Sequence, residues 1–142
     1  MVFRFPHIDE DVGVCIDFQR TLRLPDDGRD YHLPPGLGRF PLRHIEDFDL
    51  GISNHRKARG GIIMPMFQTD ALWLNFSSLG YGRQELPVAL KIGAGKINAV
   101  SGKTWADGLS QDPQNYVVLP DQSWLDGFNV EQGKVRQFLA MP

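Results

Sequence analysis

The sequence contains little cysteine and no long apolar run, and both shortages restrict the classes of protein that it can encode. A chain whose single cysteine is Cys15 cannot form an internal disulfide, which excludes a disulfide-stapled scaffold and fits a reducing compartment. The longest apolar run covers residues 61–67 and contains Pro65, whereas a membrane-spanning helix needs about 20 residues. The N-terminus lacks the apolar region of a secretory signal. We therefore expect a soluble, cytoplasmic protein with no membrane partner.

A strong charge of either sign is also missing. The 15 Lys+Arg and 17 Asp+Glu residues leave a formal net charge of −2 at pH 7. This balance provides no overall attraction to a phosphate backbone, so we expect no nucleic-acid partner.

Turn-forming residues, by contrast, are abundant. The 142 residues include 15 glycines and 10 prolines, which disfavours a helical bundle. Apolar residues mostly alternate with a period of two, and turn signals separate the short alternating segments. The pattern predicts an all-β chain, with residues 1–142 forming a single domain. Its expected architecture is a β-sandwich or an open β-barrel of about nine to ten short antiparallel strands.

The expected strands follow from local patterns. Residues 12–18 are almost continuously apolar or β-branched, as in a buried strand, and residues 116–119 form another strand closed by Pro120. Residues 45–50 fit either a helical turn or a short strand. The expected hairpins pair residues 21–24 with 31–33, 62–67 with 71–76, 88–92 with 96–100, and 128–131 with 135–140.

Four strings in the second half of the chain carry a resemblance. They are DALWLNF (70–76), KINAVSG (96–102), WLDGF (124–128) and RQFLAMP (136–142). Together they resemble a family of uncharacterised bacterial and fungal proteins. The resemblance implies no activity and no site residues. Members of that family run on beyond the final Met-Pro, so we expect the sequence to be truncated at Pro142.

Several catalytic templates fail at specific residues. Gly102, Lys103 and Thr104 match the end of a phosphate-binding P-loop, but Ile97 stands where that loop needs its first glycine. The Gly-x-Gly pairs at 36, 80 and 93 lack the third glycine of a dinucleotide fingerprint. Cys15 lies between Val14 and Ile16, which favours a buried inert thiol over a nucleophile. We therefore favour a protein without catalysis.

Two groups of side chains are candidates for ligand binding. The string Trp-x-Asp-Gly occurs twice, and its tryptophans together with a third are candidate aromatic platforms: Trp73, Trp105 and Trp124. Strand alternation places Trp73 on the face opposite Leu72 and Leu74. The densest run of cations precedes a glycine pair, in an expected flexible loop that would grip phosphate or an acidic partner: Arg56, Lys57 and Arg59. In both groups a purely structural role, as turn anchors or as a solvated surface, is the alternative.

A metal site is the remaining chemical alternative. All four histidines lie in the first 55 residues with carboxylates nearby: His7, His32, His44 and His55. Histidine and carboxylate ligands would suit a divalent metal, although the spacings match no established metal motif.

The sequence thus leads to three functional hypotheses. The first is a module that binds a small ligand, a carbohydrate or a protein without catalysis and without a cofactor. The second is a small metal-dependent or acid–base enzyme that uses the histidine-rich first half. The third is a structural subunit of a homo-oligomer that pairs through its edge strands.

Overall fold

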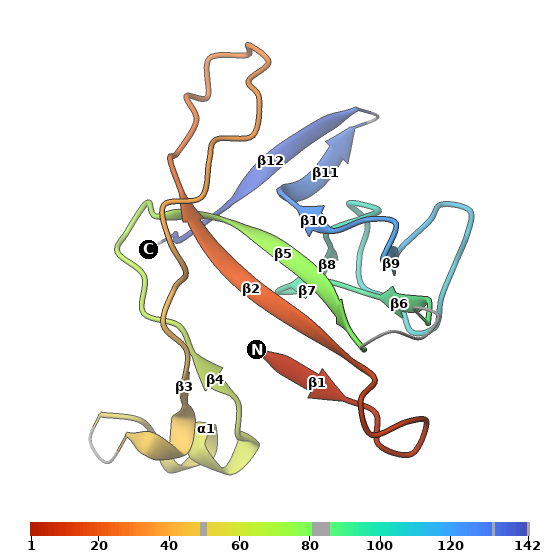
Figure 1. Ribbon diagram of the computed structural model, residues 1–142. Coiled ribbons are helices and arrows are strands. Elements are labelled where there is room, and N and C mark those ends of the chain that lie inside the picture. The colour runs from red at the N-terminus through yellow and green to blue at the C-terminus, as the bar shows by residue number, and fades with distance from the viewer. Residues whose placement is uncertain (49–50, 81–85, 132, 142) are drawn as a thin grey trace.

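The computed structural model describes residues 1–48, 51–80, 86–131 and 133–141 and confirms the all-β class (Figure 1). The described strands form one main antiparallel sheet and three two-stranded sheets, and these strands close no barrel. In chain order the strands are β1 (Val2–Arg4), β2 (Gly13–Thr21), β3 (Arg43–His44), β4 (Ile62–Ile63), β5 (Ala71–Leu79), β6 (Val88–Leu90), β7 (Gly93–Ala94), β8 (Ile97–Asn98), β9 (Val117–Leu119), β10 (Trp124–Leu125), β11 (Gly127–Glu131) and β12 (Lys134–Leu139). The helices are η1 (Ile45–Asp47) and α1 (Asn54–Arg59). Among the described residues, no helix has the length and apolarity to cross a membrane.

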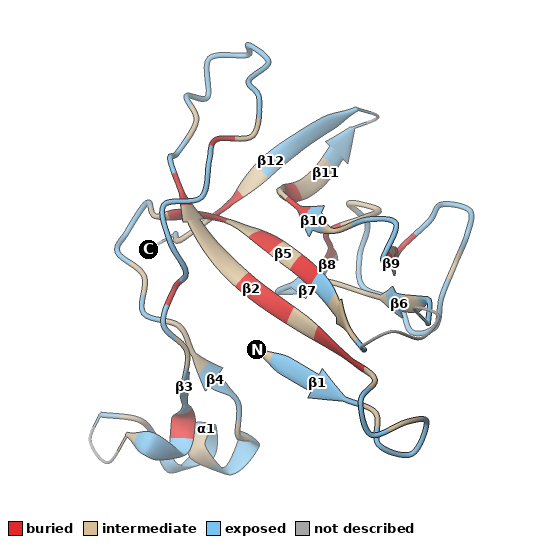
Figure 2. Cartoon of the chain, viewed as in Figure 1, coloured by how far each residue is buried: buried red, intermediate tan, exposed pale blue. Residues whose placement is uncertain are grey.

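Strands β2 and β5 form the centre of the main sheet. They pair along all nine residues of each strand, from Gly13 opposite Leu79 to Thr21 opposite Ala71. Because side chains alternate between faces, one face presents the apolar residues of both strands. This core face consists of Val14, Ile16, Leu72, Leu74 and Phe76, all of which are buried (Figure 2).

The far edge of β2 is covered by two separate segments. Its first half pairs with β1, where Ile16 N–H donates to Met1 O at 2.7 Å. Its second half pairs with residues 37–40, where Phe40 N–H donates to Phe18 O at 2.8 Å. The expected return strand at residues 31–33 is therefore wrong. The chain returns to β2 only after Pro34 and Pro35, which have no N–H to donate to a neighbouring strand.

On its other edge, β5 pairs with two different strands, β12 and β10, at neighbouring positions. The end of β12 pairs with β5 at Ala71 and Leu72, and β10 pairs with β5 at Leu74 and Asn75. Between these two points, beside Trp73, the chain leaves β5 after β10 and continues into β11. Strand β11 pairs with β12, and the two form the β11–β12 hairpin (Figure 1). This hairpin confirms the one expected at residues 128–131 and 135–140, although Gln132 of its turn lies outside the described residues.

The small sheets differ from the expected hairpins. Strand β6 pairs with β9, and only the short β7–β8 pair remains of the hairpin expected at residues 88–92 and 96–100. The strand expected at residues 116–119 is confirmed as β9, and its Val117 and Leu119 are among the most buried residues of the core. The partner of β6 is thus the non-local strand β9, which brings Val117 and Leu119 to the core, and Ala99 reaches the same core from outside this pair.

Two further expectations concern residues 45–79. Strand β4 pairs with β3, and β5 pairs with β2, β10 and β12, so the hairpin expected between residues 62–67 and 71–76 is wrong. Pro65 interrupts its first arm, which shortens that strand to two residues. Of the segment 45–50, residues 45–47 form the 3₁₀ turn η1, and residues 49–50 lie outside the described residues.

The expected flexible loop of cations is instead the short helix α1. The side chain of Ser53 accepts a hydrogen bond from Arg56 N–H at 3.4 Å and caps the start of the helix. Gly60 ends it at a φ of 65°, a conformation that glycine adopts without steric cost. Three cations occupy the last turn of α1, where the helix dipole favours positive charge.

Candidate functional site

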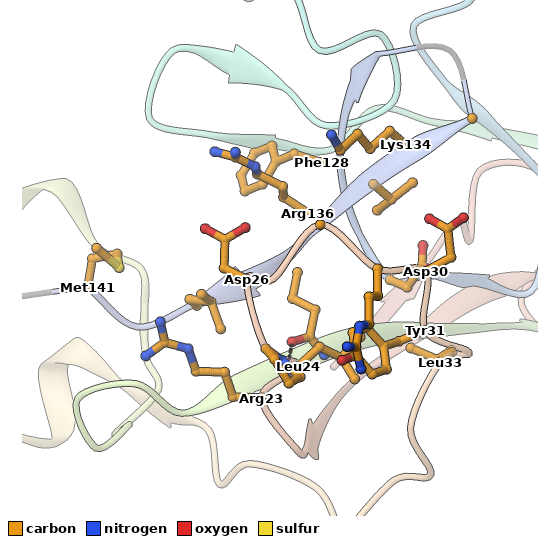
Figure 3. A pocket seen from close by; sticks show the side chains of 18 residues that line it. Arg23, Leu24, Asp26, Asp30, Tyr31, Leu33, Phe128, Lys134, Arg136 and Met141 are labelled. Atoms are coloured by element: carbon orange, nitrogen blue, oxygen red, sulfur yellow. Dashed lines mark hydrogen bonds between the residues drawn. The ribbon is translucent and has the colours of Figure 1, made fainter.

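An open groove of about 700 Å³ lies between the long loop, residues 22–36, and strand β12 (Figure 3). One wall comes from the long loop and the other from the β11–β12 hairpin. Apolar side chains from both walls line part of it, including Leu24, Leu33, Val135 and Leu139. Its volume falls within the range of about 300–1,000 Å³ that is usual for ligand pockets.

Hydrogen bonds at both of its ends hold the long loop in place. At the start, Leu24 N–H donates to Gln137 Oε1 at 2.7 Å, and Gln137 Nε2 donates to Leu22 O at 3.0 Å. At the end, the buried hydroxyl of Thr21 donates to Pro34 O and Pro35 O at 3.2 and 3.0 Å. The loop is therefore attached to β2 and β12 while its middle stands away from the sheet.

The tip of the long loop is organised around Asp27. The phenol of Tyr31 donates a hydrogen bond to Asp27 Oδ2 at 2.8 Å, and Arg29 Nε lies 3.7 Å from the same oxygen. The hydrogen bond to the carboxylate stabilises the protonated phenol and raises the pKa of Tyr31 above its ordinary value of 10.0. Tyr31 and Arg29 both line the groove, whereas Asp27 does not. Asp27 therefore positions two lining residues from outside the groove.

Charges of both signs line the groove without forming ion pairs with described residues. The cations are Arg23, Lys134 and Arg136, and the carboxylates are Asp26, Asp30 and Asp126. No described group of opposite charge lies within 4 Å of any of them. Figure 3 shows Lys134 and Arg136 on the hairpin wall, with Asp26 and Asp30 on the loop wall. Such groups remain available for a charged ligand.

A second polar surface lies on the face of the main sheet opposite the core. Asp17, Asn75 and Trp124 are in register across β2, β5 and β10. Asp17 forms an ion pair with Arg39 at 3.1 Å, and Trp124 is 53% exposed. Trp73 lies two residues from Asn75 on the same face, opposite Leu72 and Leu74, as the alternation predicts. We call these residues the polar face.

The sequence-predicted tryptophans are only partly brought together. Trp73 and Trp124 are diagonal neighbours on the polar face, at a spacing of about 7–8 Å between Cα atoms. Trp105 follows β8 in a different part of the fold, where Lys91 Nζ lies 4.3 Å from the centre of its ring. Lys91 also donates to Ala106 O and to Gly108 O, so it fastens the first Trp-x-Asp-Gly string as a loop.

None of the predicted cations and histidines is among the described residues that line the groove, although His32 lies between two lining residues, Tyr31 and Leu33. Arg56 and Arg59 are exposed on α1, and Lys57 is half-buried there. All four histidines are exposed: His7 follows β1, His32 is in the long loop beside Tyr31, His44 is in β3, and His55 is in α1. No three His, Cys, Asp or Glu side chains among the described residues gather as a metal site would require.

The groove itself was not predicted from the sequence. Residues 25–28 had the composition of a turn, and Lys134 and Arg136 belonged to an expected strand, so neither segment carried a binding motif. The signal that was present is the alternation of cations at Lys134 and Arg136, which places both on one face of a strand near the end of the chain.

Comparisons of the chain with family models, with curated proteins and with solved structures found no match.

Proposed function

We propose that this protein is a binding module without catalysis and that its ligand occupies the groove between the long loop and β12. One observation carries this proposal: three cations and three carboxylates without ion-pair partners among the described residues line one open cavity of about 700 Å³. A ligand with polar or charged groups would supply the missing partners, and Leu24, Leu33 and Leu139 would contact its apolar parts.

The test is a titration of the full chain, labelled with nitrogen-15, against a panel of charged small molecules and short peptides. The panel contains single amino acids, dicarboxylates, sugar phosphates and blocked pentapeptides. We expect at least one member to shift the backbone amide signals of Leu24, Gln137 and Leu139. A panel in which no member shifts these signals, or in which all shifts fall elsewhere, contradicts the proposal.

A pair of substitutions separates groove binding from surface charge effects. We expect Arg136→Ser to weaken binding of the panel member found, because it removes an unpaired cation from the groove wall. Lys96→Ser is the matched control, because Lys96 is an exposed cation in the turn between β7 and β8. Equal loss of binding in both variants would speak against the groove.

The polar face supports a second candidate, the recognition of a carbohydrate. Sugar rings stack on exposed aromatic rings, and Trp124 is 53% exposed beside the half-buried Asn75, whose amide would bind hydroxyls. The test is the change in tryptophan fluorescence on addition of neutral oligosaccharides. A change that persists in Trp124→Leu contradicts this candidate.

The cytoplasm is the location that we propose for this module. The support is the lone Cys15, which is half-buried in β2 as a free thiol.

A further inference from the structure

The edge of β12 that faces the long loop, here called the outer edge, turns backbone groups toward the groove. Ala140 N–H donates to Asp70 O at 2.9 Å, and Ala140 O accepts from Thr69 N–H at 2.9 Å, so the backbone of Ala140 faces β5. Backbone groups alternate between the two edges of a strand. Those of Leu139 therefore point away from β5, to the outer edge, and those of Gln137 follow two residues earlier.

The pairing of β12 with β11 leads to the same result. Val135 lies opposite Asn129, but Asn129 N–H donates to Ala99 O at 2.8 Å, away from β12. Opposite residues of an antiparallel pair exchange either both hydrogen bonds or neither. Val135 therefore also turns its N–H and C=O to the outer edge. Among the described residues no strand pairs with this edge, and Val135, Gln137 and Leu139 all line the groove.

An unpaired strand edge beside a groove is a template for an added strand. We propose that the groove binds an extended polypeptide segment, with acidic residues at alternate positions, as an additional antiparallel strand on the outer edge of β12. This inference rests on the proposed function and names its ligand class. Residues 134–139 offer a length of about 20 Å, at about 3.4 Å per residue, which matches six residues of the ligand.

Charge determines which polypeptide fits. Lys134 and Arg136 lie on one face of β12, both are exposed, and neither has a carboxylate partner among the described residues. Opposite charges on facing strands attract, so glutamate or aspartate is favoured opposite these two cations. At the intervening positions, the ligand meets Val135 and Leu139, which favours apolar side chains there.

The same charges argue against a second copy of this chain as the occupant. If two copies paired antiparallel through their outer edges about Val135, Lys134 of one copy would face Arg136 of the other. Like charges directly opposite on neighbouring strands repel. Cations on an edge strand also protect proteins against such self-pairing, whereas an acidic partner relieves the repulsion.

The first test uses a blocked hexapeptide with glutamate at positions four and six and valine elsewhere, titrated calorimetrically into the full chain. The glutamates then lie opposite Arg136 and Lys134, and the valine at position three lies opposite Gln137 and exchanges backbone hydrogen bonds with it in the proposed pairing. N-methylation of that valine is expected to weaken binding about tenfold, because one backbone hydrogen bond is lost. N-methylation of a glutamate is the control, because its N–H points away from β12, and we expect a much smaller change.

The second test exchanges charges. Arg136→Glu is expected to weaken binding of the glutamate peptide about fivefold and to strengthen binding of the corresponding lysine peptide. Lys96→Glu changes the net charge equally at an exposed site outside the groove and is expected to leave both affinities unchanged. Amide spectra of both variants report whether the fold is retained.

The outcomes separate this inference from the proposed function. Equal binding of the two N-methylated peptides overturns strand addition. Small charged molecules that shift the groove amides, together with peptides that do not bind, overturn the inference and leave the proposed function standing. If light scattering shows self-association and no peptide binds, the inference is overturned, and a second copy of the chain is the occupant of the outer edge. No binding of peptides or small molecules overturns both.

Discussion

The side-chain amide of Gln137 accepts a hydrogen bond from Leu24 N–H at 2.7 Å, across 113 positions of the sequence. The same amide donates to Leu22 O at 3.0 Å, so one side chain serves the long loop as a neighbouring peptide group would. These two hydrogen bonds connect the β12 wall of the groove to the wall formed by the long loop.

Substituting Gln137→Ala is expected to release the start of the long loop. Two hydrogen bonds are lost, each with a net contribution of about 1 kcal/mol, so the free energy of unfolding should fall by about 1–2 kcal/mol. The amide of Leu24 should also exchange with solvent faster. Urea unfolding and hydrogen exchange measure the two effects. Gln68→Ala, at an exposed site, is the control. Unchanged protection of the Leu24 amide in Gln137→Ala would contradict the attachment of the loop by Gln137.

Asp27→Asn is expected to lower the pKa of Tyr31 toward 10.0. The hydrogen bond to the Asp27 carboxylate stabilises the protonated phenol, so it raises the pKa of Tyr31 in the folded protein. The contribution of this bond to loop order is therefore complete below pH 10 and is lost as the pH rises through the raised pKa. The ultraviolet absorbance of tyrosinate, as the difference between each protein and its Tyr31→Phe variant, measures the shift. Identical titrations with and without Asp27 would refute the assignment.

Asn98→Ala is expected to destabilise the core side of the molecule strongly. Asn98 is 2% exposed; its Oδ1 accepts from Val100 N–H and Ser101 N–H at 3.0 and 2.9 Å, and its Nδ2 donates to Asn115 O at 2.8 Å. Alanine leaves buried backbone groups without partners, so we expect a loss of about 3 kcal/mol in unfolding free energy. Chemical denaturation checks this value, with the exposed Asn54→Ala as the reference. A loss no greater than that of the reference would show that water replaces the amide.

Gly127→Ala is expected to disturb the point where the hairpin leaves β5. A Cβ atom on Gly127 would overlap the carbonyl oxygen of Arg136 on the facing strand, and backbone cannot move aside as a side chain does. We expect a destabilisation of at least about 2 kcal/mol. Gly133→Ala in the turn of the same hairpin meets no neighbouring atom and should cost only about 1 kcal/mol for its positive φ. Thermal melts compare the two, and equal losses would contradict the described junction.

Local patterns predicted those parts of the fold whose partners are close in sequence. The alternation in residues 128–131 and 135–140 predicted the terminal hairpin, because its two arms are joined by a short turn. The run at residues 12–18 predicted a buried strand, because Val14 and Ile16 occupy alternate positions that face the core.

Pairings between distant segments could not be predicted in the same way. Residues 71–79 have a strand pattern, but the pattern does not state that β2, β10 and β12 are the partners. Helix α1 lacks an apolar stripe, since none of its residues is buried, so periodicity offered no signal for it. The groove could not be predicted because it also depends on distant segments: its two walls, around Leu24 and Gln137, lie more than 100 positions apart.

The pairing of β2 with β5 also has a kinetic consequence. Its paired residues are separated by 50 to 66 positions, so the two strands must meet before most local segments have a surface to pack against. Proteins dominated by such distant contacts fold slowly, in milliseconds to seconds. The cost of closing the intervening stretch rises only by about 0.6 kcal/mol for each doubling of its length. The intervening residues 22–70 can therefore lengthen or shorten with little effect on this encounter, and the long loop that forms the groove wall is part of that tolerant stretch.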